Sequence, residues 1–286
     1  MEQDAGREPD TTRASALEPA RPRPQLVRNS FLLLDGMWGF AHDDDDRGVA
    51  DRWFDGRELR SSILVPFPPE SPASGVGETG FHPIVWYRRT LSEADLAAAG
   101  HQPSQRAILR FGAVDYRAAV WIDGQLVGEH EGGHTPFALD ITDALDGDAR
   151  EHVIVVRAED DPHDLAQPRG KQDWEEQPHS IWYHRTTGIW QSVWLESVAP
   201  QHITGLNWTS DLTDGTVTLE LRLSRPGIAC ASVRIAHEGR ELAAATMRTS
   251  GTRATLTIPL DGQRNGQNYE RLLWSPDRPT LLDAWI

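Results

Sequence analysis

The chain has 286 residues, of which 38% are hydrophobic and 25% charged, a composition typical of a globular protein with a buried core. Its formal charge of −15 argues against nucleic acid and anionic membranes as partners, because both need a basic surface. No apolar run approaches the roughly 20 residues of a membrane-spanning helix, and no secretory signal is visible. The single cysteine, Cys230, excludes an internal disulfide, so a reducing, cytoplasmic location is expected.

The start of the chain and one short segment stand apart from a sequence dominated by strand patterns. Residues 1–27 are expected to be a disordered lead-in, because Pro, Arg, Glu and Ala occur there without periodicity. The stretch SEADLAAAG (92–100) predicts a short helix, with Ser92 as its N-cap and Gly100 just after its end. Helical pattern is scarce elsewhere.

The strand signals predict an all-β protein. Two apolar runs in RAAVWIDGQLVGEH (117–130) surround Asp123-Gly124, a dipeptide that favours a tight hairpin. The β-branched run HVIVVRAED (152–160) is typical of a buried strand. Clean alternation of apolar and polar residues predicts further strands in TVTLELRLS (216–224) and RATLTIPL (253–260). Many short strands separated by turns indicate β-sandwiches.

A change of character near Pro200 predicts two domains. Before it the strands are Trp-rich and the loops long, and after it the strands alternate plainly. We therefore expect one domain over residues 28–199 and a second over residues 200–286.

Two short patterns resemble metal-binding motifs, but neither has the local structure or spacing that a metal site requires. His130-Glu131-Gly132-Gly133-His134 matches H-E-x-x-H, which binds zinc when a helix brings the two imidazoles to one face. Here the two glycines and the upstream hairpin predict a loop between strands instead. The acidic run from Asp43 to Asp46 lacks the spacing of a calcium loop and is expected to be a solvated loop. The sequence therefore predicts no metal and no cofactor.

Four ordered stretches resemble the family 2 glycoside hydrolases, which include β-galactosidases, β-glucuronidases and β-mannosidases. The first stretch resembles the family's sugar-binding domain and has its V-W-(N/D)-G strand, Gly-Gly loop and P-F turn. It reads FGAVDYRAAVWIDGQLVGEHEGGHTPFALDITDAL (111–145). The other three stretches are RNSFLLLDGMWGFAHD (28–43), VPFPPESPASGVGETGFHPIVWYRRT (65–90) and TTGIWQSVWLESV (186–198).

The resemblance implies a jelly-roll sandwich followed by an immunoglobulin-like sandwich. In the family a TIM barrel with two catalytic glutamates comes next, and such a barrel needs about 250 further residues. The segment LLWSPDRPTLLDAWI (272–286) resembles the approach to the last strand of the second domain. We therefore expect the second domain to be truncated before that strand, the barrel to be a missing partner, and the open sheet edge to allow homo-oligomers.

The same resemblance points to two loops that would shape a sugar pocket. In β-galactosidases of the family, an aspartate that contacts the sugar lies where Trp182 stands here, a departure from the family pattern. Amide and carboxylate groups bind sugar hydroxyls, and an indole face covers the apolar side of a pyranose. The candidate substrate-binding residues are Glu70, Ser71, Ser74 and Gly75 in the first loop, and Lys171, Gln172, Asp173, Trp174, Trp182 and Arg185 in the second.

The expected function is that of the N-terminal portion of a family 2 glycosidase, with a β-glycoside or oligosaccharide as substrate. No catalytic residue is expected in this chain. Retaining glycosidases need two carboxyl groups about 5–5.5 Å apart, and the neighbours Glu175-Glu176 and Asp160-Asp161 are expected to be solvated loop acids. The alternative is a free-standing carbohydrate-binding module.

Overall fold

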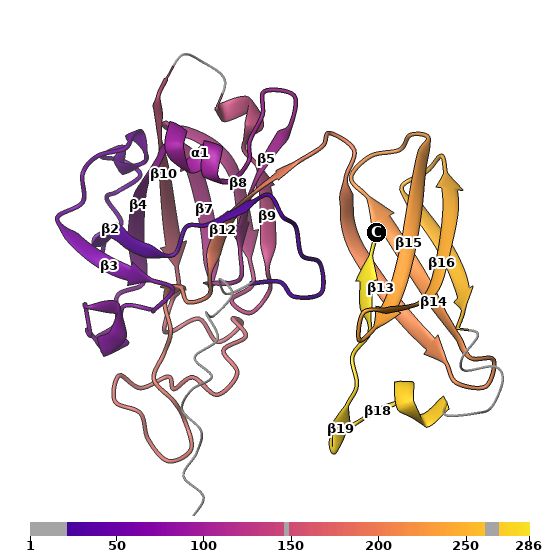
Figure 1. Ribbon diagram of the computed structural model, residues 1–286. Helices are drawn as coiled ribbons and strands as arrows, with labels where there is room; N and C mark the ends of the chain where they lie inside the picture. The colour runs from indigo at the N-terminus through magenta and orange to yellow at the C-terminus, as the bar shows by residue number, and fades with distance from the viewer. Residues whose placement is uncertain (1–21, 146–148, 261–268) are drawn as a thin grey trace, which may run out of the picture.

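The computed structural model describes residues 22–145, 149–260 and 269–286 and is all-β, as predicted. Figure 1 shows two groups of strands, one formed by β1 to β12 and the other by β13 to β20, joined where β12 leads into β13. Residues 1–21 of the expected lead-in lie outside the described residues, and Arg23, near the end of that segment, forms an ion pair with the buried Glu196. No helix in the described ranges has the length and apolar character needed to cross a bilayer.

The first group is built on two antiparallel sheets. The six-stranded sheet has the order β3-β2-β4-β10-β7-β8 and the four-stranded sheet the order β1-β12-β5-β9. A two-stranded ladder pairs β11 with β6. The strands of this group are β1 (Phe31–Leu33), β2 (Gly36–His42), β3 (Ser61–Val65), β4 (Ile84–Ser92), β5 (Arg106–Phe111), β6 (Val114–Asp115), β7 (Arg117–Ile122), β8 (Gln125–Glu131), β9 (Phe137–Asp140), β10 (Glu151–Glu159), β11 (Gly188–Ile189) and β12 (Val193–Val198).

The two sheets of this group enclose one hydrophobic core. Trp38, Tyr87 and Val156 from the six-stranded sheet pack in the same cluster as Phe111 and Leu195 from the four-stranded sheet. The opposite face of the six-stranded sheet carries a second apolar layer of Ile84, Trp86, Trp121 and Val155, covered in part by the 3₁₀ turn η1 (Trp53–Asp55). Strand β10 is therefore apolar on both faces, which explains its continuous β-branched run.

Local signals in the sequence form the elements that they predict. The helix α1 (Glu93–Ala98) begins at Ser92, whose side chain accepts from the Asp95 amide while the Asp95 carboxylate accepts from the Ser92 amide, a capping box. Asp123 and Gly124 both have positive φ angles, 50° and 81°, as a two-residue hairpin between β7 and β8 requires. The short turns η2 (Pro72–Ser74) and η3 (Thr142–Ala144) complete this group.

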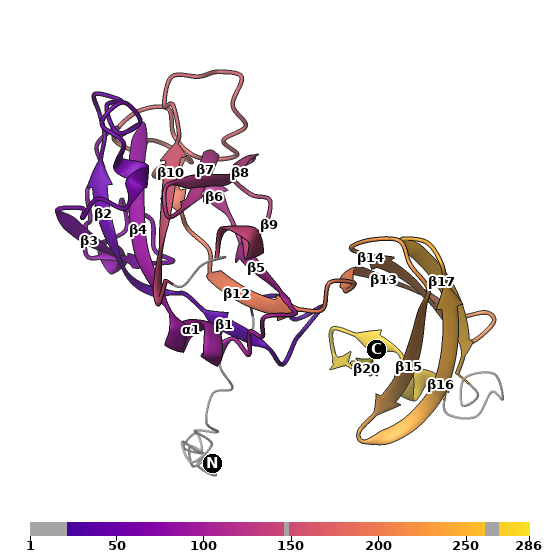
Figure 2. The same cartoon turned by 90° about the horizontal axis from the view of Figure 1, so that it is seen from above.

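The second group forms a smaller sandwich, seen at the right of Figure 2. Its sheets have the orders β13-β14-β17 and β16-β15-β20, and their inner faces share one apolar cluster. Leu219 and Leu221 of β14 are buried while Glu220 is exposed, so the predicted alternation is confirmed. Its elements are β13 (Ile203–Asp211), β14 (Thr216–Leu223), β15 (Ala229–His237), β16 (Arg240–Thr249), β17 (Arg253–Pro259), η4 (Tyr269–Leu272), β18 (Trp274–Ser275), β19 (Arg278–Pro279) and β20 (Asp283–Trp285).

Two groups of acids that were expected to be solvated include buried members. Asp43 is only 4% exposed, because its carboxylate accepts hydrogen bonds from the amides of Arg47 and Gly48 and from the Trp86 indole. Asp160 is 2% exposed and is paired with Arg185. The prediction was wrong for both residues because Trp86 and Arg185, the side chains that partner these carboxylates in the folded chain, lie 43 and 25 residues away in the sequence. Asp44, Asp45 and Asp46 are exposed as expected.

Candidate functional site

The two loops named by the sequence lie against each other in the first group of strands. The β3–β4 loop covers residues 66–83, and the β10–β11 loop covers residues 160–187 and extends below the left-hand strands in Figure 1. The Thr187 amide donates to Glu70 Oε2 at 3.2 Å. The Phe81 ring meets the His163 ring edge-on at 5.6 Å between centroids. One surface therefore presents both loops.

In the β3–β4 loop, the side chains of Ser71 and Ser74 serve the local backbone. Ser71 caps the turn η2 by accepting from the Ala73 amide at 3.3 Å. The buried Ser74 hydroxyl donates to the Ser71 carbonyl at 2.7 Å and accepts from the Val76 amide at 3.0 Å. Gly75 follows in the left-handed conformation with φ of 83°, which glycine adopts without strain.

Asp173 organises the outer part of the β10–β11 loop. Its fully buried carboxylate accepts from the amides of Glu175 (3.0 Å) and His179 (2.7 Å) and contacts the His179 ring at 2.8 Å. Burial favours the protonated carboxyl group, but these hydrogen bonds outweigh it and hold the pKa of Asp173 below its usual value. The Asp173 amide donates in turn to the Tyr183 carbonyl, which closes the loop on itself.

Gln172 links the loop to the strands beneath it. Its Nε2 donates to Asp115 Oδ2 at 2.8 Å, and its Oε1 accepts from the Thr186 amide at 2.9 Å. The Thr186 hydroxyl donates to the same Asp115 oxygen at 3.3 Å. Asp115 is 1% exposed at the end of β6, so Gln172 and Thr186 satisfy a carboxylate that water does not reach.

Arg185 anchors the end of the same loop through Asp160. Arg185 Nη2 lies 2.5 Å from Asp160 Oδ2, and both side chains are buried. The Thr187 hydroxyl donates to Asp160 Oδ2 at 3.3 Å, and the side-chain Nε2 of Gln167 donates to Asp160 Oδ1. Asp160 and Arg185 are therefore a buried, hydrogen-bonded ion pair.

Thr186 and Thr187 thus donate hydrogen bonds to three carboxylates, those of Glu70, Asp115 and Asp160. Burial, with a smaller contribution from the charge of Asp160, raises the pKa of Glu70 to about 7. The same two causes, in the same order, raise the pKa of Asp115 to about 6. Glu70 and Asp115 consequently change protonation near neutral pH, where ordinary carboxyl groups are fully ionised.

The raised pKa of Glu70 predicts a pH dependence of stability. The folded chain binds a proton at Glu70 up to about pH 7, whereas the unfolded chain releases it near 4.5. Stability from this group is therefore highest below about pH 4.5 and falls as the pH rises through 7. Urea unfolding at pH 5 and pH 8 measures the effect. In the unaltered chain Glu70 should lower the free energy of unfolding by up to about 3 kcal/mol as the pH rises, and this loss should be absent in Glu70→Gln. If the free energy of unfolding of Glu70→Gln changes with pH as much as that of the exposed control Glu129→Gln, the assignment is contradicted.

The exposed side chains of the β10–β11 loop are the ones that a ligand in solution can reach. Trp174 is 47% exposed and meets the half-buried Trp182 edge-on at 5.2 Å between ring centroids. Lys171, in the same loop, is also exposed. Gln172, Asp173 and Arg185 instead support the loop from within. Direct sugar contact by any of the ten residues stays a prediction.

The H-E-x-x-H stretch lies partly in the expected loop and partly on a strand, since His130 and Glu131 are the last residues of β8. His130 belongs to β8, where its ring stacks on Phe137 and its Nε2 lies 2.9 Å from the Thr135 hydroxyl. His134 lies beyond the strand, with its ring edge against Trp190 at 5.5 Å. The two imidazoles therefore contact different neighbours.

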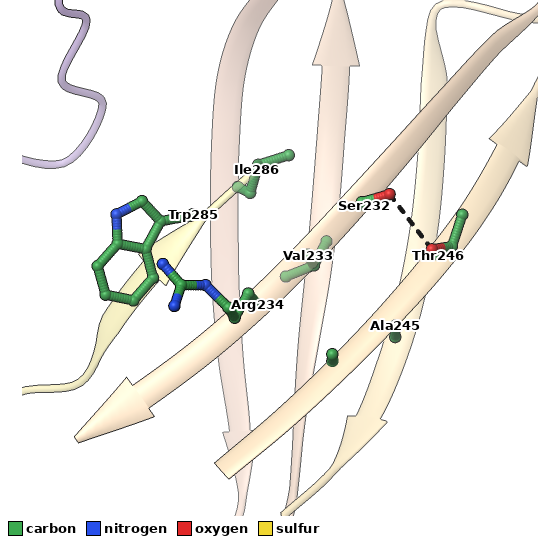
Figure 3. Close-up of a pocket in the computed structure, with 8 residues that line it drawn as sticks. Ser232, Val233, Arg234, Ala245, Thr246, Trp285 and Ile286 are labelled. Atoms are coloured by element: carbon green, nitrogen blue, oxygen red, sulfur yellow. Dashed lines mark hydrogen bonds between the residues drawn. The ribbon is translucent and has the colours of Figure 1, made fainter. Parts of the chain in front are cut away.

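The second sandwich carries an open groove of about 570 Å³ beside β20. Figure 3 shows the Arg234 guanidinium next to the Trp285 indole, 4.0 Å from its ring centroid, and a hydrogen bond between Ser232 and Thr246. The Ser232 and Thr246 hydroxyls therefore partner each other, and the guanidinium lies over the face of the indole.

Comparison with known proteins finds a family match within the first group of strands. Residues 74–199 match the family described as "Glycosyl hydrolases family 2, sugar binding domain", so the predicted resemblance is confirmed for this segment. Among curated proteins, β-glucuronidase from Canis lupus familiaris is 38% identical over 117 residues, covering 38% of this chain and 18% of the relative. β-Galactosidase from Thermoanaerobacter pseudethanolicus is 25% identical over 175 residues, covering 54% and 22%.

Solved structures extend the likeness of fold beyond that domain. Lactobacillus rhamnosus β-glucuronidase aligns with a TM-score of 0.64 and 22% identity over 91% of this chain and 42% of its own. A Ruminococcus gnavus β-glucuronidase in complex with D-glucaro-δ-lactam aligns with a TM-score of 0.65 and 19% identity over 91% and 43%. The chain spans less than half the length of these proteins.

Sequence reasoning missed Asp115 and Thr187 and treated Asp160 as a surface acid. No local pattern indicates the role of Asp115, because its partner Gln172 lies 57 residues away. A weak signal existed for Arg185, since an arginine within an aromatic loop needs a counter-charge.

Proposed function

We propose that this chain forms the N-terminal, substrate-shaping part of a β-glycosidase that cleaves O-glycosyl bonds. The observation that carries the proposal is the sugar-binding-domain match over residues 74–199. The β3–β4 and β10–β11 loops would face the sugar, held in place by the buried network of Asp160, Arg185 and Gln172. A catalytic barrel with the two glutamates would follow in the complete enzyme, and the names of the similar proteins favour β-glucuronides or β-galactosides as substrates.

Activity of the chain by itself tests this division of labour. We expect no turnover of 4-nitrophenyl β-D-glucuronide or β-D-galactoside by the 286-residue chain, and hydrolysis by a polypeptide in which a barrel follows residue 286. Turnover by the chain alone that disappears in Glu70→Gln or Asp173→Asn would place the catalytic acids here and overturn the proposal.

A free-standing carbohydrate-binding module is the second candidate, favoured by the exposed edge-to-face pair of Trp174 and Trp182. In that case the chain alone binds sugar, and loss of the Trp174 indole weakens binding about tenfold, or about 1.4 kcal/mol. Tryptophan fluorescence titration with methyl β-D-glucuronide measures this, with Trp274→Ala as control because Trp274 is 60% exposed on the β18–β19 hairpin, outside the first group of strands. Equal affinity in both variants would exclude the indole platform.

A further inference from the structure

A cluster of two histidines and a glutamate lies outside the network described above. His42 is the last residue of β2, and Glu78 and His82 lie in the β3–β4 loop shortly before β4. One side-chain donor atom from each residue lies within 4.8 Å of the other two. Glu78 Oε2 is 3.4 Å from His42 Nδ1 and 3.7 Å from His82 Nε2.

These distances are close to those of a metal centre. Zinc bonds of about 2.0–2.1 Å in a tetrahedron place neighbouring donor atoms roughly 3.3 Å apart. The two imidazoles stack at 3.8 Å between centroids with 22° between their planes, so one ring must rotate for both nitrogens to face one ion. His82 is 25% and Glu78 57% exposed, and side chains at the surface can make this adjustment.

Asp44 supplies a second, independent feature of a metal site. Its two carboxylate oxygens lie 2.9 and 3.1 Å from His82 Nδ1. This contact places the proton on Nδ1 and leaves the Nε2 lone pair directed toward Glu78. A carboxylate that fixes the tautomer of a ligating histidine in this way is a regular companion of zinc-binding imidazoles.

The His42 side chain is also placed to act as a metal ligand. Its Nε2 is buried without a hydrogen-bond partner, which leaves Nδ1 as the nitrogen that faces Glu78. The nearby carboxylates of Asp44 and Glu78 make the position attractive to a cation.

We propose that His42, Glu78 and His82 bind a divalent transition-metal ion, with Zn²⁺ as the best match, and that Asp44 orients His82. Two imidazoles and one carboxylate form a ligand set that zinc accepts, with water in the fourth position. The ion would link the end of β2 to the β3–β4 loop, the loop that also carries Glu70.

Calorimetric titration of the untagged, EDTA-treated chain with Zn²⁺ at pH 7.5 tests the proposal. We expect one ion per chain, at least tenfold weaker binding in His82→Gln and Glu78→Gln, and about tenfold weaker binding in Asp44→Asn. Co²⁺ in the same site should give the intense visible absorption of a tetrahedral centre. Circular dichroism shows whether each variant is folded before it is titrated.

His134→Gln is the matched control, because His134 belongs to the H-E-x-x-H stretch and lies outside the cluster. It should bind Zn²⁺ like the unaltered chain. Sub-stoichiometric binding, or equal affinity in the unaltered chain and His82→Gln, would overturn the proposal. Binding lost in His134→Gln and retained in His82→Gln would move the site to the motif that the sequence first suggested.

Discussion

Replacing Asp160 with asparagine is expected to lower the free energy of unfolding by about 3 kcal/mol. The change leaves the buried Arg185 guanidinium without its counter-charge, and removing one member of a buried ion pair costs about 3–5 kcal/mol. Urea unfolding monitored by tryptophan fluorescence measures the effect.

The control for this experiment is an ion pair at the surface. Arg52 and Asp55 are 67% and 43% exposed, and Arg52→Gln should cost less than about 1 kcal/mol. The double variant Asp160→Asn/Arg185→Gln should recover part of the loss, since it leaves no unpaired charge. If Asp160→Asn costs no more than Arg52→Gln, the pair does not anchor the β10–β11 loop.

Gly188→Ala is expected to destabilise the first sandwich by about 2–5 kcal/mol. Gly188 has a φ of +76°, and a methyl group there would overlap the hydroxyl end of Tyr87, a fully buried side chain. The left-handed backbone costs a residue with a Cβ about 1–2 kcal/mol, and overpacking a core costs about 1–3 kcal/mol. The Ile189 amide, which donates to the Tyr87 hydroxyl at 3.2 Å, would lose its partner.

Gly170→Ala separates backbone strain from the steric overlap. Gly170 lies in the β10–β11 loop with a φ of +58°, and no atom lies within 4 Å of the position that its Cβ would take. We expect a loss of about 1 kcal/mol for this variant. Equal losses for Gly170→Ala and Gly188→Ala would mean that Tyr87 moves aside freely.

The features predicted well from the sequence depend on residues close together in the chain. Alternation in β14, the Asp123-Gly124 turn and the Ser92 N-cap each require at most a few neighbouring residues. Periodicity and turn chemistry act over the same short range, so they are visible before any fold is known.

The candidate site was only partly predictable because its partners are distant. The loop residues were found through the family motif, but their hydrogen-bond partners were not. Gln172 and Asp115 are 57 residues apart in the sequence, and Arg185 and Asp160 are 25 residues apart. The buried state of Asp43 depends on Trp86, 43 residues later. The His42 cluster was missed for the same reason: His82 is brought beside the end of β2 only when β4 pairs with it.

The position of the first strand also bears on how the protein folds as it is synthesised. Strand β1 pairs with β12, and Arg28, just before β1, binds Glu196 across 168 residues of chain. At a ribosomal rate of about 5–20 residues per second, β12 emerges roughly 10–30 s after β1. During that interval the apolar residues of β1 have no partner strand, so this is the period in which the nascent chain would benefit most from a chaperone.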